Sequence, residues 1–240
     1  MSVEQIKEIV ARVVAHRPSG AVENGTGFLV SQNLAITCAH CLGDPEDYAQ
    51  STLLRFTSWK RYDNDRKGEV IEIDWDLDVA LLRLDQMAQV KLLPLERQSL
   101  AEEQWRSFAY PQQVDRDGIT LEGRVRDIEG KFHNEEMLEL ECKEIKTPED
   151  LLHGASGAPI VVARGAIIGI LTNQLLQYPK QTLRQGEAII AAFGRVYALP
   201  LKRLAAHPQF KNYLHINVSF GGTYKETYGE TKVAYEFYFP

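Results

Sequence analysis

The segment Gly154-Ala155-Ser156-Gly157-Ala158-Pro159 places one serine between small residues, and the aliphatic run Ile160-Val161-Val162 follows it. Glycine and alanine allow a tight turn and let another molecule approach the serine hydroxyl closely. A glycine-rich turn before a buried strand would explain the same residues. Ser156 is therefore a candidate nucleophile whose interpretation depends on residues far upstream.

The overall composition is that of a soluble globular protein. The 240 residues are 44% hydrophobic and 25% charged, enough for one large all-β domain or two small ones. The net charge of −6 argues against a broad nucleic-acid-binding surface. No apolar run approaches the roughly 20 residues that cross a bilayer, and the N-terminus is charged where a signal peptide is apolar. We expect neither nucleic acid nor a membrane as a partner.

The cysteines indicate a reducing compartment. The three residues Cys38, Cys41 and Cys142 are too few for a disulfide framework. Cys38 and Cys41 have CxxC spacing, but a second CxxC pair or a His-rich partner that would indicate zinc is missing. Cys142 alternates with charged residues in an expected strand, which is typical of a core thiol. We therefore predict the cytoplasm as the location and expect neither a metal nor a cofactor.

Helical patterns stand at three places. Ser2 and Gln5 have the capping-box spacing before a helical apolar stripe, which predicts a helix over residues 2–16. A similar pair, Ser99 with Glu102, predicts a short helix or a helical loop within residues 99–108. Residues 201–214 look helical with a break at Pro208. The N-terminal apolar stripe would pack on the following domain or dock a partner.

Between these segments the pattern is that of short β-strands. Apolar or alternating runs are separated by turn residues, and a terminal pair at 215–220 and 232–239 has no readable role. The expected strands are 25–30, 34–37, 53–59, 69–73, 78–84, 119–128, 137–145, 161–163, 166–171 and part of 188–199. Many short strands at regular spacing indicate a barrel or a sandwich.

Two upstream residues supply the chemistry that a serine nucleophile needs. His40 ends an apolar strand, and Asp78 opens the buried run Val79-Ala80-Leu81-Leu82. A serine hydroxyl reacts only when an imidazole takes its proton and a carboxylate orients that imidazole. Alone, His40 would be an ordinary core residue and Asp78 a strand-end residue bonded to local amides.

Four motifs in chain order make the sequence resemble the trypsin/chymotrypsin-like serine peptidases, in particular the compact bacterial branch similar to the HtrA-type proteases. They are Gly25-Thr26-Gly27-Phe28-Leu29-Val30, Thr37-Cys38-Ala39-His40, Asp78-Val79-Ala80-Leu81-Leu82 and Gly154-Ala155-Ser156-Gly157-Ala158-Pro159. The resemblance implies a mostly β fold of two six-stranded antiparallel barrels, with an N-terminal helix and a short C-terminal helix or hairpin. It divides the chain into residues 1–20, a peptidase domain at 21–207 and an extension at 208–240.

The resemblance also implies the site residues. His40 would be the general base, Asp78 its orienting partner and Ser156 the nucleophile, while the N–H groups of Gly154 and Ser156 would form the oxyanion hole. Asp74 and Asp76 are rivals to Asp78, but only Asp78 precedes the Val-Ala-Leu-Leu run.

The specificity residue implied by the family is Asp150, at the base of the pocket for the substrate side chain before the cleaved bond. A carboxylate there would attract Arg or Lys. Residues 148–150 also fit a solvated loop whose charges bind nothing.

The sequence departs from the secreted members of the family at two positions. Gly25 occupies the place of the cysteine that would bridge to Cys41, and Ala155 occupies the place of the aspartate that pairs with a freed N-terminus. An Ile-Val-Gly-Gly-like start is also absent. We therefore expect control by a regulatory protein partner or an allosteric signal instead of zymogen cleavage.

The function implied is a serine endopeptidase that cleaves a protein or peptide substrate through an acyl-enzyme. The alternatives are a catalytically silent protease-like module that binds proteins, and a stand-alone structural β domain.

Overall fold

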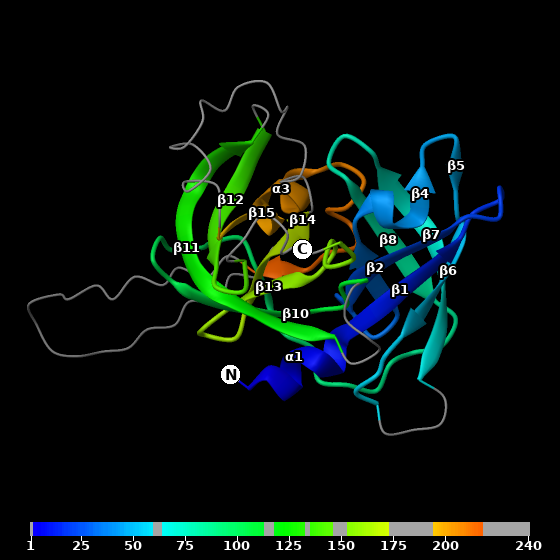
Figure 1. Cartoon of the computed structure of the whole chain (residues 1–240), viewed down its shortest axis with the longest axis horizontal. Helices are drawn as coiled ribbons and strands as arrows, with labels where there is room; N and C mark the ends of the chain where they lie inside the picture. Colours follow the sequence, from blue (N-terminus) through cyan, green and yellow to red (C-terminus); the bar gives the residue numbers. More distant parts are fainter. Residues whose placement is uncertain are drawn as a thin grey trace, which may run out of the picture.

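The computed structural model describes residues 2–59, 64–112, 118–132, 135–145, 153–172 and 194–217. Most of these residues form antiparallel strands arranged in two lobes that lie side by side (Figure 1). Strands between residues 10 and 84 form one lobe, and the described strands from residue 95 onward form the other.

The first lobe is a closed barrel. Its strand order is β1-β2-β3-β8-β7-β6, and β1 closes the ring because it pairs with both β2 and β6. The strands are β1 (Val10–His16), β2 (Val22–Leu29), β3 (Leu34–Thr37), β6 (Ser51–Arg55), β7 (Asp65–Asp74) and β8 (Val79–Leu84). Between β3 and β6 lie the 3-10 helix η1 (Ala39–Leu42) and the short hairpin of β4 (Gly43–Asp44) and β5 (Asp47–Tyr48).

The second lobe is also a barrel. Its order is β13-β10-β11-β12-β15-β14, and the pairing of β13 with β14 closes the ring. The strands are β10 (Gln104–Ala109), β11 (Ile119–Phe132), β12 (Glu135–Cys142), β13 (Pro159–Val162), β14 (Ile167–Thr172) and β15 (Arg195–Pro200). The short strands β9 (Leu95–Glu96) and β16 (Ile216–Asn217) extend the sheet beside β14 in parallel. The prediction of two six-stranded antiparallel barrels is confirmed.

Apolar packing joins the two barrels. One core cluster fills the first barrel and continues to Phe108, Ile170 and Leu199 of the second, while a separate cluster fills the second barrel. Strands β13 and β14 are buried along their whole length, as their uninterrupted apolar runs require. The shared core fixes the junction between the barrels, since a close-packed interior resists sliding.

The N-terminal helix is shorter than the capping-box pattern predicted. Helix α1 covers only Val3–Ile9, and residues 10–16 are strand β1. Val10, Val13 and Ala15 are fully buried, and β1 pairs along its whole length with β2. The prediction of helix for this second half was wrong because β-branched residues that also fit alternation bury better in a barrel.

The expected helix within residues 99–108 is also absent. Residues 104–109 form β10, which pairs with β11 and β13. The barrel ladder supplies hydrogen bonds that override the local capping pair.

The C-terminal helix was predicted correctly in part. Helix α3 covers Leu201–Ala206 and ends before Pro208. The expected strand at 232–239 lies outside the described residues, as does the part of 188–199 before residue 194.

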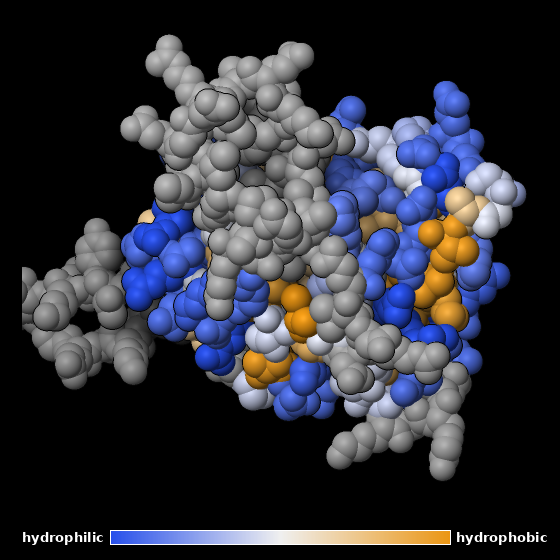
Figure 2. All heavy atoms as spheres, viewed as in Figure 1, coloured by the Kyte–Doolittle hydropathy of each residue, from blue (hydrophilic) through white to orange (hydrophobic). Residues whose placement is uncertain are grey.

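The coloured residues on the face shown in Figure 2 are mostly hydrophilic, with small separate hydrophobic areas. Within the described ranges, no helix is long and apolar enough to span a bilayer.

Candidate active site

His40 stands on the tight turn that leaves β3. The three residues before His40 are buried in the core, namely Thr37, Cys38 and Ala39. In contrast, 46% of the His40 side chain is exposed. The carbonyl of Cys38 accepts the Cys41 N–H at 3.2 Å, which closes the 3-10 turn. The strand end thus presents the imidazole at the surface of the first barrel.

Asp78 holds the histidine through two contacts. Its Oδ2 accepts from His40 Nδ1 at 2.7 Å, and its Oδ1 accepts from the His40 backbone N–H at 3.0 Å. The Asp78 backbone has φ +56°, a left-handed conformation that non-glycine residues seldom adopt. The side chain is only 10% exposed, so the paired carboxylate is largely shielded from water. Backbone strain of this kind is typical of functional positions.

The His40–Asp78 contact changes the acidity of the imidazole. Partial burial of the ring lowers the His40 pKa, but the hydrogen bonds and charge interactions with Asp78 and Cys41 together outweigh burial and raise the pKa above its usual value. A carboxylate that accepts from Nδ1 also leaves the Nε2 nitrogen as the basic site. This arrangement is suited to taking a proton at Nε2.

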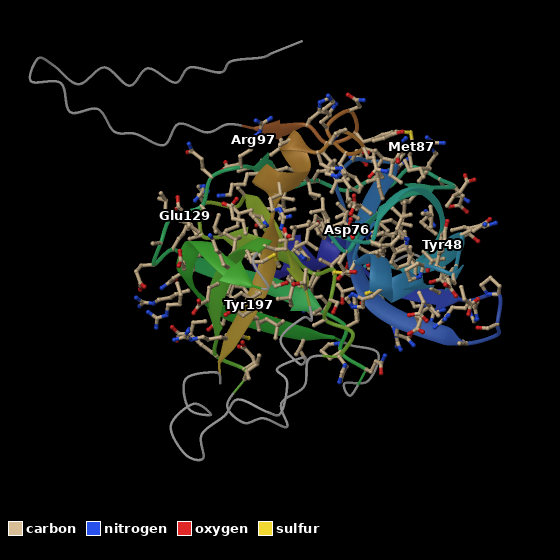
Figure 3. The ribbon with its side chains drawn as sticks, turned by 90° about the horizontal axis from the view of Figure 1, so that it is seen from above. Tyr48, Asp76, Met87, Arg97, Glu129 and Tyr197 are labelled. Atoms are coloured by element: carbon tan, nitrogen blue, oxygen red, sulfur yellow. The ribbon has the colours of Figure 1, made fainter. Side chains whose placement is uncertain are left out.

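The rival carboxylates have other neighbours. Asp74 Oδ1 accepts the Leu77 N–H at 2.8 Å, and its Oδ2 lies 3.2 Å from His207 Nε2. Asp76 is exposed and lies over the junction of the two barrels (Figure 3). Of the three aspartates, Asp78 is the one that contacts His40 in the described structure.

Ser156 lies in a sharp turn of the second barrel, directly before β13. Two glycines with positive φ make the turn, Gly154 at +91° and Gly157 at +89°. Ser156 is 1% exposed, and its Oγ has no hydrogen-bond partner among the described residues. The backbone carbonyl of Ser156 is well bound, accepting from Thr26 N at 2.9 Å and from Cys41 Sγ at 3.6 Å.

The Cys41 contact explains the glycine at position 25. A Cβ at Gly25 would lie 2.3 Å from Cys41 Sγ, so the thiol occupies the space that a side chain would need. Gly25 and Cys41 are therefore adjacent, and all three cysteines are free thiols.

One cluster of the described residues has the composition of a metal site. The ligand atoms of Cys38, His40 and Asp78 lie within 4.8 Å of one another. However, Cys38 Sγ donates to the Leu171 carbonyl at 3.4 Å, and burial raises the pKa of this thiol well above its usual value. A metal requires the thiolate, so the cluster fits proton transfer better than metal binding.

Of the two remaining predicted site residues, Gly154 is described by the structure and Asp150 is not. Gly154, which was predicted to line an oxyanion hole, has its carbonyl bound to Thr26 Oγ1 at 2.7 Å. Asp150, which was predicted to select basic side chains, lies outside the described residues. Thr26 stands inside the Gly25–Val30 motif, but no feature of the sequence pattern predicted a role for it.

A protein-family model matches more than half of the chain. The model of the trypsin-like peptidase domain family matches residues 25–170. None of the curated protein sequences matches the chain significantly.

Two solved proteases have the same fold at low sequence identity. The active form of the Rv3671c protease from M. tuberculosis is 18% identical with a TM-score of 0.61, over 85% of this chain and 80% of that one. The inactive form of the Rv3671c protease has a TM-score of 0.57 at 15% identity, over 82% and 86% of the two chains. The HtrA-type protease AlgW, solved with a tripeptide, is 16% identical with a TM-score of 0.61, over 84% of this chain but 59% of its own.

Proposed function

Since this chain belongs to the trypsin-like peptidase family and is a peptidase by that membership, we propose that it is a serine endopeptidase. Ser156 would attack the scissile carbonyl, and the reaction would pass through an acyl-enzyme that water hydrolyses. The observation that carries the proposal is the contact between His40 Nδ1 and Asp78 Oδ2 at 2.7 Å, on the barrel that faces the serine turn.

In this proposal His40 moves the proton. Nε2 takes the Ser156 hydroxyl proton as the attack begins, and it later gives that proton to the leaving amine. Asp78 holds the tautomer with the proton on Nδ1 and stabilises the imidazolium cation while it exists. The raised pKa of His40 supports this role, because the same carboxylate that raises it favours the cation.

For the reaction, the Ser156 hydroxyl must form a hydrogen bond with His40 Nε2. Ser156 Oγ has no hydrogen-bond partner in the described structure, so substrate binding would bring it within reach of Nε2. Catalytic hydrogen bonds are often long in a free enzyme and shorten in the substrate complex. The Gly154 and Ser156 N–H groups would meet the oxyanion, and the positive φ of Gly154 supports this geometry.

Control would come from a regulatory protein partner or an allosteric signal. Ala155 has no carboxylate to pair with a new N-terminus. Residues 10–16 are strand β1 of the first barrel, so cleavage near Gly25 would remove a barrel strand instead of activating the enzyme. We place the protein in a reducing compartment, the cytoplasm, because it holds three free thiols and no disulfide pattern.

Specificity for Arg or Lys through Asp150 stays part of the proposal. A library of peptide substrates tests it: cleavage after basic residues should disappear in Asp150→Ala. Cleavage after small apolar residues, unchanged by that substitution, would remove Asp150 from the site.

A fluorophosphonate probe tests the proposed function, because it labels only an activated serine. We expect labelling of the full chain at Ser156, no labelling of Ser156→Ala, and loss of peptidase activity by several orders of magnitude in Ser156→Ala and His40→Ala. The buried and unbonded Ser156 hydroxyl also fits a silent protein-binding module. A folded chain that neither labels nor cleaves peptides would favour that module.

A further inference from the structure

Thr26 lies at the contact between the histidine barrel and the serine turn. It belongs to β2 of the first barrel, and its side chain is fully buried. Its hydroxyl donates to the Gly154 carbonyl at 2.7 Å and accepts from the Tyr110 N–H at 3.0 Å. A hydroxyl has one proton to donate, so the bond from Tyr110 N–H directs that proton to Gly154.

The backbone of Thr26 binds the same turn a second time. Its N–H donates to the Ser156 carbonyl at 2.9 Å. Its carbonyl accepts from Thr37 Oγ1 at 2.7 Å, which ties Thr26 to β3, the strand that leads to His40. Thr26 therefore binds the turn on both sides of Ala155 and is itself bound to the strand that carries the base.

The serine turn is also closed by a hydrogen bond of its own. The Ala158 N–H donates to the Ala155 carbonyl at 3.1 Å, which closes the turn around the nucleophile. Peptide groups are planar, so binding the Gly154 and Ser156 carbonyls also restricts the Ala155–Ser156 peptide between them. That peptide carries the Ser156 N–H, one of the two proposed oxyanion donors.

The second barrel holds the turn by a separate contact. The Gly157 N–H donates to the Leu171 carbonyl at 2.8 Å, within the barrel that carries the turn. This bond lies within one barrel, and the Leu171 carbonyl reaches the first barrel only through the weak thiol donor Cys38 Sγ at 3.4 Å. The relation between the two proposed catalytic groups depends on contacts that cross between the barrels, and Thr26 supplies two of them.

We propose that Thr26 is a positioning residue, whose hydroxyl holds the Ser156 turn of the second barrel in register with His40 on the first. This inference rests on the proposed serine peptidase function. Without the hydroxyl, the Gly154 carbonyl and the Tyr110 N–H lose their partner inside a buried contact. The turn then loses one of its two Thr26 bonds, and the nucleophile and its N–H donor are displaced relative to the imidazole.

Three substitutions separate positioning from packing. Thr26→Val keeps the shape and removes the hydroxyl, Thr26→Ser keeps the hydroxyl, and Thr52→Val is the matched control. Thr52 is also a buried threonine of the first barrel whose Oγ1 donates to a carbonyl, that of Val14, at 2.7 Å. We expect Thr26→Val to lower kcat about 10²-fold with KM nearly unchanged, because small displacements of reacting groups cost rate and not affinity. Thr26→Ser and Thr52→Val should stay within roughly threefold of the parent protein.

Three kinetic results would overturn the proposal. They are full activity in Thr26→Val, an equal loss in Thr26→Ser, and an equal loss in Thr52→Val. If Thr26→Val does not fold, Thr26→Cys replaces it, since a thiol is a weaker donor; its kcat should fall about tenfold, and a kcat equal to that of Thr26→Ser overturns the proposal.

Amide hydrogen exchange tests the same inference without catalysis. In the Ser156→Ala protein, Thr26→Val should speed exchange of the Gly157 and Ala158 amides, while Thr26→Ser and Thr52→Val should not. Unchanged exchange in Thr26→Val would overturn the positioning role even in an active enzyme. Failure of the wild-type chain to label at Ser156 would instead overturn the proposed function, and the exchange result would still judge Thr26.

Discussion

The two halves of the candidate site are held in different ways. On the first barrel, His40 and Asp78 contact each other directly through two hydrogen bonds. On the second barrel, Ser156 is held through its backbone, while its Oγ has no partner among the described residues. The acid–base half is thus assembled by the Asp78 carboxylate, which binds both the ring and the backbone of His40, and the nucleophile half depends on the surrounding backbone.

Physical chemistry accounts for this difference. A shielded carboxylate such as Asp78 must have a charged or hydrogen-bonded partner, because an unpaired buried charge is very costly. An unpaired buried hydroxyl costs only about 1–3 kcal/mol, which a folded domain tolerates. A substrate complex that restores the missing Ser156 bond would recover this free energy during the reaction.

The largest expected effect comes from disrupting the His40–Asp78 contact. Asp78→Asn should lower peptidase activity on the order of 10⁴-fold, because an amide no longer fixes the tautomer that keeps Nε2 basic. Asp76→Asn is the control, since Asp76 is an exposed carboxylate of the same loop. Steady-state kinetics on a peptide substrate measures both, and damage from Asp76→Asn with a silent Asp78→Asn would reverse the carboxylate assignment.

The second prediction concerns the Ser156 turn, whose backbone is disturbed by a glycine substitution. At Gly157, φ is +89° and an added Cβ would lie 1.9 Å from the Thr26 carbonyl. At Gly20, φ is +88° but nothing lies within 4 Å of the added atom. Both alanine substitutions carry the cost of left-handed backbone, about 1–2 kcal/mol, and Gly157→Ala adds a clash with backbone.

Denaturant unfolding measures the pair of glycine variants. Gly20→Ala should lose about 1 kcal/mol of unfolding free energy, and Gly157→Ala should lose more than about 4 kcal/mol or fail to fold. Equal losses of unfolding free energy would mean that the Ser156 turn can move away from Thr26 at little cost. This result would contradict a tight contact between the turn and Thr26.

The smallest expected effect is a shift in the pH dependence of kcat/KM. The base must be neutral, and Asp78 raises the His40 pKa, so kcat/KM should rise with pH through a pKa above the usual ~6.5. In Asp78→Asn the rising limb should move to lower pH. The raised pKa also adds stability that is present below pH ~6.5 and lost as pH rises through the folded-state value, so Asp78→Asn should destabilise most at low pH. A rising limb that Asp78→Asn leaves in place would contradict this coupling.

Much of the fold was predictable because strand signals are local. The alternation and apolar runs that predicted strands 25–30, 34–37 and 78–84 correspond to β2, β3 and β8. One failure fell at residues 10–16, where apolar spacing fitted both a helix and a strand. The other fell at residues 104–109, where the capping pair Ser99 and Glu102 suggested a helix. Pairing with strands distant in the chain decided these cases, and periodicity within one segment does not contain that information.

By itself, the sequence determined the types and the order of the groups, namely His40, Asp78 and Ser156 within four motifs, because peptide hydrolysis by serine needs those functional groups. The tertiary structure decided which aspartate reaches His40, that residues 10–16 close a barrel, and that Thr26 binds the serine turn. The Thr26–Gly154 hydrogen bond joins residues 128 positions apart. Such contacts arise only when two barrels pack together, since neither segment specifies its distant partner locally.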